Sequence, residues 1–352
     1  GDDFLNTDTE SGHAGFRSTL AKSFMFGETR LELTYGFDFL RDRFSRPFVD
    51  PATGDITGYV SPDIILRTYA FFAQGNLDFG RLSLIGGARR GLFPGEGKNN
   101  GYDASLFDVG CPPRIGESDL WLFNLGATFD VTPGFQVYGG FSQGAELTEL
   151  GRAARGIQDP SLISPEPATS DQYEIGVRGA SGQWAYTAAA FYSESDSASE
   201  LQADPSCAGQ SFCPLIPLRA PQRFHGVEAT LDWTRDERLS IGALLTYQRG
   251  EIFVEDLSQY IEYSTDVVSP FRVTGYVEFE ILPMWRNRVQ ATYFGAADYF
   301  TPAELDFGPV NTESAFVVDL MSSYPIGPGT LSLGVSNLLN NEYVNVTNQG
   351  YG

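Results

Sequence analysis

Short and long breaks alternate along this chain between segments in which apolar and polar residues alternate. Tight turns are predicted at Gly27-Glu28, Phe79-Gly80, Val131-Gly134, Ala180-Gly182, Arg235-Glu237, Leu282-Met284 and Pro325-Gly329. Long polar loops are predicted near Arg41–Asp63, Leu92–Glu117, Gly144–Thr169, Glu194–Pro221, Gly250–Ser269 and Asp298–Glu313. Strands of about ten residues, with short turns at one rim and long loops at the other, are typical of a bacterial outer-membrane β-barrel.

The two faces of the predicted strands differ in a way that supports this interpretation. In the segment Arg223–Thr234 the apolar residues are Val227, Ala229, Leu231 and Trp233, and the residues between them are Glu228, Thr230 and Asp232. A soluble β-sandwich also alternates, so the period of two leaves a soluble all-β protein as the alternative. Charged residues and glycine through the middle of one face, with aromatic residues near the turns on the other, favour a wet lumen and a lipid-facing surface.

The predicted fold is therefore all-β, a transmembrane antiparallel β-barrel. We expect about 14 strands, from near Phe16 to near Asn337, in one domain that covers residues 1–352. No apolar run reaches the roughly 18 residues that a transmembrane helix needs. The chain is 14% aromatic and contains 39 Gly, which does not fit a disordered protein.

The charge of the chain argues against nucleic acid as a partner. The formal net charge is -22, and no basic patch in the sequence would neutralise phosphates. An acidic balance suits a hydrated lumen and large polar loops.

The sequence contains two weak matches to catalytic or nucleotide-binding motifs. Gly140 to Gly144 matches the G-x-S-x-G nucleophile elbow, but a helix and a suitably placed His are missing after it. Gly95 to Asn99 is glycine-rich with a Lys, yet it lacks the Ser or Thr of a P-loop and is expected to be an exposed loop. With 2 His in the chain, a His-rich metal site is excluded. We expect no enzymatic activity, no catalytic residues and no metal site.

Two of the 3 cysteines lie close together in one predicted loop. Cys207 and Cys213 are expected to form a disulfide at an oxidising cell surface, and two free thiols are the alternative. Cys111 is left over.

Several segments resemble the barrel of TonB-dependent outer-membrane receptors, particularly the siderophore receptors. The residues that carry the resemblance are Ser164 to Gly179, Trp184 to Tyr192, Arg223 to Glu228, Tyr138 to Gly144 and Gly334 to Tyr343. In this order they cover most of the chain. The resemblance implies the C-terminal part of a barrel that has about 22 strands in the family, with the N-terminal plug domain and the last strand absent from this chain.

The resemblance also implies a function. A receptor of this type binds a ferric siderophore with its extracellular loops, and the plug then gates its passage. The implied partners are outer-membrane lipid, a ferric siderophore and, through the plug, the TonB–ExbB–ExbD energy-transducing complex. The implied location is the cell outer membrane of a Gram-negative bacterium. No cofactor is expected, because the ferric chelate would be the substrate. The alternatives are a passive porin-like channel and TonB-dependent uptake of a vitamin or sugar.

Residues of the predicted loops are the candidates for binding an anionic ligand. Arg152 and Arg155 have guanidinium groups that match carboxylate geometry, whereas ion pairs with Glu146 or Glu149 are the alternative role. The further candidates are Arg219, Arg223, Tyr102 and Tyr299.

Carboxylates recur on the polar face of one predicted strand after another. They are Glu174, Glu228, Asp232, Glu278, Glu280 and Asp319. We expect them either to pair with arginines of a plug or to form a hydrated wall.

Overall fold

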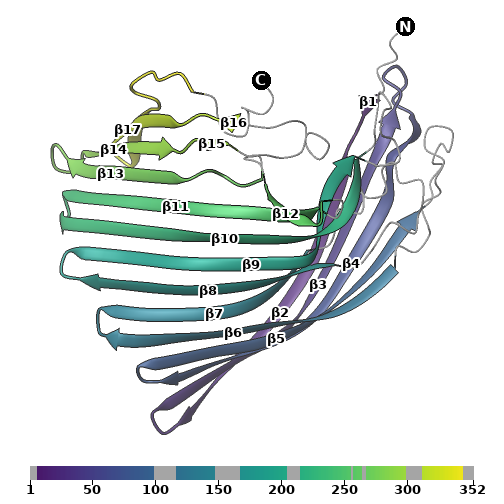
Figure 1. Cartoon of the computed structure of the whole chain (residues 1–352), viewed down its shortest axis with the longest axis horizontal. Helices are drawn as coiled ribbons and strands as arrows, with labels where there is room; N and C mark the ends of the chain where they lie inside the picture. The colour runs from purple at the N-terminus through teal and green to yellow at the C-terminus, as the bar shows by residue number, and fades with distance from the viewer. Residues whose placement is uncertain are drawn as a thin grey trace. The chain divides into compact units, whose positions relative to one another are not determined.

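The computed structural model describes residues 6–98, 116–146, 167–203, 215–254, 257–263, 267–298 and 311–343. In these residues the regular structure consists of β-strands and the turns that join them (Figure 1). No helix in the described ranges is long and apolar enough to cross a membrane.

Fourteen strands of seven residues or more form one sheet, in which each strand is hydrogen-bonded to the next one along the chain. They are β2 (Glu10–Phe26), β3 (Thr29–Val49), β4 (Ile56–Phe79), β5 (Leu82–Lys98), β6 (Gly116–Thr132), β7 (Phe135–Glu146), β8 (Ala168–Ser181), β9 (Trp184–Ala203), β10 (Leu215–Asp236), β11 (Leu239–Val254), β13 (Arg272–Glu280), β14 (Arg286–Phe294), β17 (Ala315–Ile326) and β18 (Gly329–Val335). The short strands are β1 (Asn6–Thr7), β12 (Gln259–Glu262), β15 (Ala297–Asp298) and β16 (Asn311–Thr312). This confirms the all-β fold and the predicted number of long strands within the described residues.

Contacts divide the chain into two compact units. Unit 1 comprises Gly1–Leu125, Ser142–Asp171 and Ser195–Pro221, and unit 2 comprises the remaining residues. In unit 1 the contacts are centred on the three-stranded run β2, β3 and β4, in which β3 pairs along almost its whole length on both sides. In unit 2 the corresponding run is β10, β11, β13, β14, β17 and β18. The single-domain expectation stays a prediction.

All seven predicted tight turns are found within a residue or two of the expected positions. Four of them contain a glycine in the left-handed region, with φ of 66° at Gly27, 72° at Gly80, 60° at Gly182 and 57° at Gly327. Two-residue hairpin turns need positive φ to follow the twist of the strands, and glycine adopts it without steric cost.

The predicted long loops are partly wrong, because many strands are longer than the expected length of about ten residues. β3 continues to Val49 and β4 begins at Ile56, so most of Arg41–Asp63 is paired sheet. In the same way β5, β9, β10 and β11 extend into their predicted loops, and Gly95 to Lys98 lie in β5 and not in an exposed loop. Backbone hydrogen bonds hold a strand together whether or not its side chains are apolar, so the change to polar composition did not mark the strand end.

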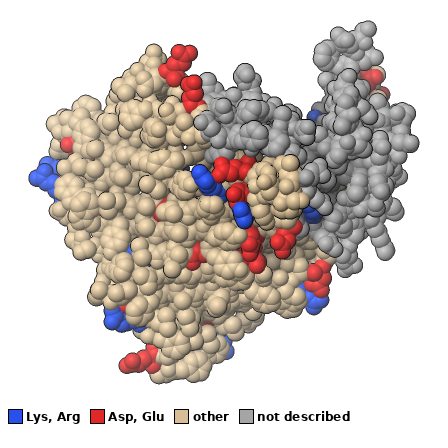
Figure 2. All heavy atoms as spheres, in the orientation of Figure 1, with Lys and Arg blue, Asp and Glu red and all other residues tan. Residues whose placement is uncertain are grey.

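One face of the sheet is apolar and exposed, and we call it the apolar face. In unit 1 it carries Phe16, which is 62% exposed, and Phe71, which is 58% exposed. In unit 2 Trp184 on β9 and Trp233 on β10 meet beside the turns, with ring centroids 6.4 Å apart. Further from the turns, Tyr173 on β8 contacts Tyr192 on β9 at 6.4 Å. Figure 2 shows a face with wide areas free of charged side chains, which gather in one central group and near the edges. Exposed aromatic residues near both ends of the strands fit a lipid-facing surface with two aromatic girdles.

Buried apolar side chains in unit 2 gather at the loop-side end of β11. β12 folds back onto β11, so that Ile252 pairs with Ile261. The ring of Tyr263 stacks on Phe224 at 5.5 Å, and Val268 is 2% exposed beside them. This loop therefore has a small apolar core of its own, on the opposite face of the sheet from Val227 and Leu231.

Candidate functional site

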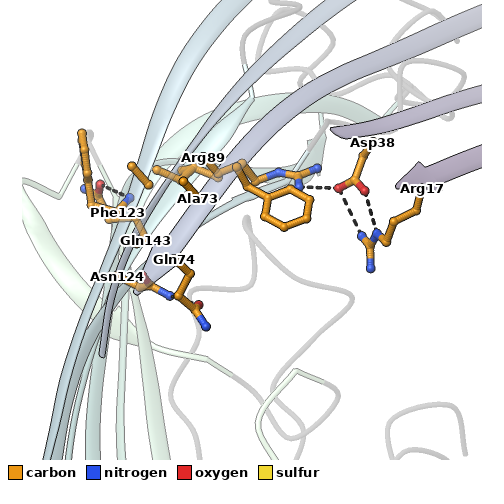
Figure 3. A pocket seen from close by; sticks show the side chains of 12 residues that line it. Arg17, Asp38, Ala73, Gln74, Arg89, Phe123, Asn124 and Gln143 are labelled. Carbon is orange, nitrogen blue, oxygen red and sulfur yellow. Dashed lines mark hydrogen bonds and ion pairs between the residues drawn. The ribbon is translucent and has the colours of Figure 1, made fainter. Parts of the chain in front are cut away.

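The polar face of unit 1 is centred on one buried carboxylate between two arginines. Asp38 on β3 lies directly opposite Arg17 on β2, whose Nε donates to Oδ1 at 2.6 Å and whose Nη2 donates to Oδ2 at 3.2 Å. Arg89 on β5 donates to Oδ2 from the other side, as Figure 3 shows. The Asp38 side chain is only 9% exposed, whereas that of Arg17 is 72% exposed. The group carries a net positive charge, with one guanidinium turned to the open side of the sheet.

A cavity of about 300 Å³ lies next to this ion-pair group. Asn124 donates from Nδ2 to Oε1 of Gln74 at 3.2 Å, and Gln143 donates from Nε2 to Oδ1 of Asp171 at 2.9 Å. The Oδ1 atom of Asn124 is buried and has no hydrogen-bond partner in the described part of the chain. A buried acceptor without a partner is costly. A hydrogen-bond donor that enters the cavity and reaches Oδ1 of Asn124 would therefore be bound favourably.

The polar face of unit 2 carries a second network, which crosses four strands. Tyr276 on β13 donates its hydroxyl to Asp232 on β10, and its ring lies across Gly242 on β11. The guanidinium of Arg288 on β14 lies over the same ring, 3.9 Å from the centroid. Arg288 also donates to Glu278 at 2.8 Å and to Gln290 at 2.9 Å. These contacts hold the polar side chains flat against the sheet.

A larger cavity, of about 820 Å³, opens at the turn-side ends of the strands of unit 2. Charged residues line it, including Glu280 and Arg286, whose Oε1 and Nε are 3.5 Å apart. The charge networks described above thus lie on one face of the sheet, and the exposed aromatic rings lie on the other.

The family model for the TonB dependent receptor-like β-barrel matches residues 1–338. The chain belongs to this TonB-dependent receptor family. The resemblance seen in the sequence motifs is therefore confirmed, and the polar face of the sheet is the lumen wall of a receptor barrel.

Two curated relatives are receptors for ferric chelates. The chain is 25% identical to the ferric aerobactin receptor of Escherichia coli over 98% of this chain and 50% of the relative. It is 24% identical to the rhizobactin receptor of Rhizobium meliloti (strain 1021), over 97% of this chain and 48% of the relative. The chain spans about half the length of the curated relatives that it matches.

Solved structures show the same fold. The copper transporter OprC superposes with a TM-score of 0.77 at 13% identity, over 100% of this chain and 55% of that protein. The ferric-catecholate import receptor Fiu of Escherichia coli K12 superposes with a TM-score of 0.68 at 17% identity, over 96% of this chain and 52% of that protein.

The carboxylates predicted on the lumen wall of the TonB-dependent receptor barrel mostly find partners within the wall itself. Glu278 pairs with Arg288, Glu280 with Arg286, and Asp232 accepts from Tyr276. Asp319 accepts a hydrogen bond from the backbone N–H of Asn337 at 3.0 Å. The sequence prediction offered a plug or water as their partners and missed these cross-strand pairs, because it did not align the strands.

Most of the predicted ligand residues lie outside the described residues. These are Tyr102, Arg152, Arg155 and Tyr299, together with the proposed disulfide pair Cys207 and Cys213. Arg219 lies in β10 and is partly buried.

Arg223 is held by its neighbours in the sheet of the receptor barrel. It forms an ion pair with Glu251, and its guanidinium lies 3.9 Å from the centroid of the Tyr260 ring. Its hydrogen bond to Glu251 raises the pKa of the Arg223 guanidinium. It shares a face with Val227, so its side chain starts from the apolar face and not from the lumen wall.

Sequence reasoning missed Arg17 and Arg89. Asp38 was recognisable as a polar-face residue from the alternation around it, but Arg89 is 51 residues away and reaches it only through the pairing of β3, β4 and β5.

The two motif matches lie in strands. Ser142 and the whole motif from Gly140 to Gly144 lie within β7, so the strand-to-helix turn of a nucleophile elbow is not formed there. Among the described residues, no group of three or more His, Cys, Asp or Glu is placed to hold a metal ion.

Proposed function

We propose that this chain forms the barrel wall of a receptor that imports a ferric siderophore across the outer membrane of a Gram-negative bacterium. The observation that carries the proposal is the match of the receptor-barrel family model to nearly the whole chain. The two curated relatives, which are receptors for ferric aerobactin and rhizobactin, support a ferric siderophore as the ligand class. About half of the length of each relative matches nearly the whole of this chain.

The lumen wall supports a role in holding a segment inside the barrel. The ion-pair group of Arg17, Asp38 and Arg89 offers a surplus guanidinium, and Asn124 offers a buried acceptor beside it. We infer that a plug segment binds here through an acidic side chain and a hydrogen-bond donor. Its release would be driven by the TonB–ExbB–ExbD complex, and the barrel would have no catalytic part in the process.

Growth under iron limitation tests the transport proposal. A strain that lacks the gene should fail to grow on one ferric chelate of a siderophore panel, with ferric aerobactin and rhizobactin tested first. The cloned gene should restore growth, and a strain without TonB should show the same defect. Binding of the radiolabelled ferric chelate to outer membranes should be lost only in the strain that lacks the receptor.

The alternatives give different results in the same experiment. Uptake that persists without TonB would indicate a passive channel. Normal growth of the deletion strain on every ferric chelate, together with a defect on a vitamin or sugar, would show that the siderophore proposal is wrong.

A further inference from the structure

Residues 281–285 form the turn between β13 and β14 (Figure 1), and all five of them are apolar. We call this segment the apolar turn. Ile281, Leu282 and Met284 are each more than half exposed. The other six tight turns have glycine, proline, or a charged or polar residue at their two central positions, which are Gly27-Glu28, Gly80-Arg81, Pro133-Gly134, Gly182-Gln183, Glu237-Arg238 and Gly327-Pro328. Among the seven tight turns of the described residues, this one is therefore the apolar exception.

The backbone of the apolar turn is strained at Met284. The N–H of Trp285 donates to the carbonyl oxygen of Leu282 at 2.9 Å, and Met284 has a φ of 69°. The turn thus has Pro283 at its first central position and a positive φ at its second, where glycine is the usual residue. A Cβ atom makes this conformation unfavourable. Four of the other turns place glycine at positive φ, so the methionine requires a reason other than the shape of the backbone.

The residues at the two ends of the apolar turn belong to the apolar face of the sheet. Ile281 lies on the same face of β13 as Val277, which is in register with Trp233 through the strand between them. The ring of Trp285 meets Tyr324 on β17 edge-on, with centroids 6.4 Å apart. Aromatic rings at the ends of strands are typical of the interface between a membrane and water. The apolar turn is therefore continuous with the lipid-facing surface.

The two strands that the apolar turn joins are short for strands that cross a membrane. β13 and β14 have nine residues each, at the lower limit of about 9–11 residues for strands of membrane barrels. At about 3.3 Å per residue and a tilt of about 40°, such a strand rises about 23 Å, whereas the apolar band of a barrel is about 25 Å tall. The hydrocarbon therefore reaches the ends of these strands, and the residues just beyond them lie at its boundary.

We propose that the apolar turn inserts Leu282 and Met284 into the turn-side leaflet, at the boundary between headgroups and acyl chains. Both side chains leave water there, and the transfer of their apolar surface supplies the free energy that offsets the strain at Met284. The turn thereby adds apolar height where two short strands provide little of it. This inference rests on the outer-membrane location in the proposed function, and not on the identity of the ligand.

Oxidation of Met284 in lipid nanodiscs tests the insertion. The full-length protein, in discs of dioleoyl phosphatidylcholine, is treated with chloramine-T, an anionic oxidant that stays in water. Mass spectrometry measures the initial rate of sulfoxide formation at each methionine. Glu28→Met, at the exposed tip of the β2–β3 turn, supplies the reference rate for a methionine in water. Met284 should be oxidised about ten times more slowly, because burial of a methionine side chain in hydrocarbon favours the inserted position by about that factor.

The thickness of the bilayer distinguishes lipid from any other cover. In discs of dilauroyl phosphatidylcholine the acyl chains are shorter, so the boundary recedes from the turn. The rate at Met284 should then approach the rate of the Glu28→Met reference. A cover supplied by another part of the same protein would protect Met284 equally in both kinds of disc.

Two results would overturn the proposal. They are equal rates for Met284 and the reference in the thicker discs, and protection of Met284 that does not depend on bilayer thickness. The comparison between the two kinds of disc uses the wild type, so it remains valid if the reference variant does not fold. Siderophore uptake is a separate measurement, and failure of the insertion leaves the transport proposal unaffected.

Discussion

At the scale of single residues, Asp38 shows how a charge is kept on the lumen wall. Its carboxylate is almost fully enclosed, and two guanidinium groups satisfy both oxygens. Removing one partner of a buried ion pair leaves an uncompensated charge in the protein, and this costs far more free energy than removing one partner of an ion pair exposed to water. The arginines are more exposed than Asp38, so the carboxylate is the member whose loss matters most.

Asp38→Asn should therefore destabilise the folded barrel by about 1–2 kcal/mol, because Arg17 and Arg89 lose their shared acceptor. The measurement is urea-induced unfolding of the full-length protein refolded into lipid vesicles. Asp236→Asn is the control, since Asp236 is about half exposed and lies 3.7 Å from Arg235. An Asp38 variant as stable as this control would contradict the role given to the ion-pair group.

At the scale of elements, pairs of strands are joined by rings that lie across glycines. A Cβ added to Gly242 would lie 2.5 Å from the Tyr276 ring and 2.3 Å from Oδ1 of Asp232. The glycine on β11 thus leaves room for the ring, which in turn reaches Asp232 on the next strand. An aromatic ring over a glycine also covers backbone that the missing side chain leaves bare.

Gly242→Val should displace the Tyr276 ring, break its bond to Asp232 and destabilise the barrel by about 1–3 kcal/mol, as overpacking does elsewhere. Gly334→Val on β18 is the matched control, because a Cβ there would meet nothing within 4 Å. The same unfolding measurement applies, with near-ultraviolet circular dichroism to report the environment of the tyrosine. An unchanged tyrosine signal in the Gly242 variant would show that the ring does not depend on the glycine.

At the scale of the whole molecule, the two faces of the sheet suit two different environments, hydrocarbon and water. The exposed aromatic and aliphatic residues would be a liability in water, whereas hydrocarbon accommodates them. The charge networks on the other face would be equally unfavourable in hydrocarbon. Membership of the receptor family gives both faces their environment, lipid on one side and a wet lumen on the other.

Leu231→Arg tests this assignment. Leu231 is 46% exposed on the apolar face and lies five residues from the turn-side end of β10, close to the middle of the band. The substitution should cost about 2–4 kcal/mol in vesicles, because an arginine near the midplane must be drawn out of the hydrocarbon. Thr230→Arg, one residue away on the lumen wall, should cost much less. Equal costs at the two positions would contradict the division into a lipid face and a lumen face.

Sequence reasoning predicted the strands, their number, all seven tight turns and the two faces, because each of these depends on residues close together in the chain. Turn glycines and the alternation around Leu231 are local signals, and the family motifs are continuous segments. It predicted the strand ends poorly, because the loop-side extensions of β3 and β4 have no apolar face to mark them.

The pairing of strands decided what the sequence left open. Whether Asp38 meets Arg17, whether Arg89 joins them, and whether Arg41 lies opposite Arg67 depend on register, and a shift of one residue would exchange the faces. The alternation of apolar and polar residues depends only on neighbours in the sequence. The sequence alone therefore determined that the sheet has a lipid face and a wet face. Which charges meet on each face is set by hydrogen bonds between residues dozens of positions apart, and only the tertiary structure contains that information.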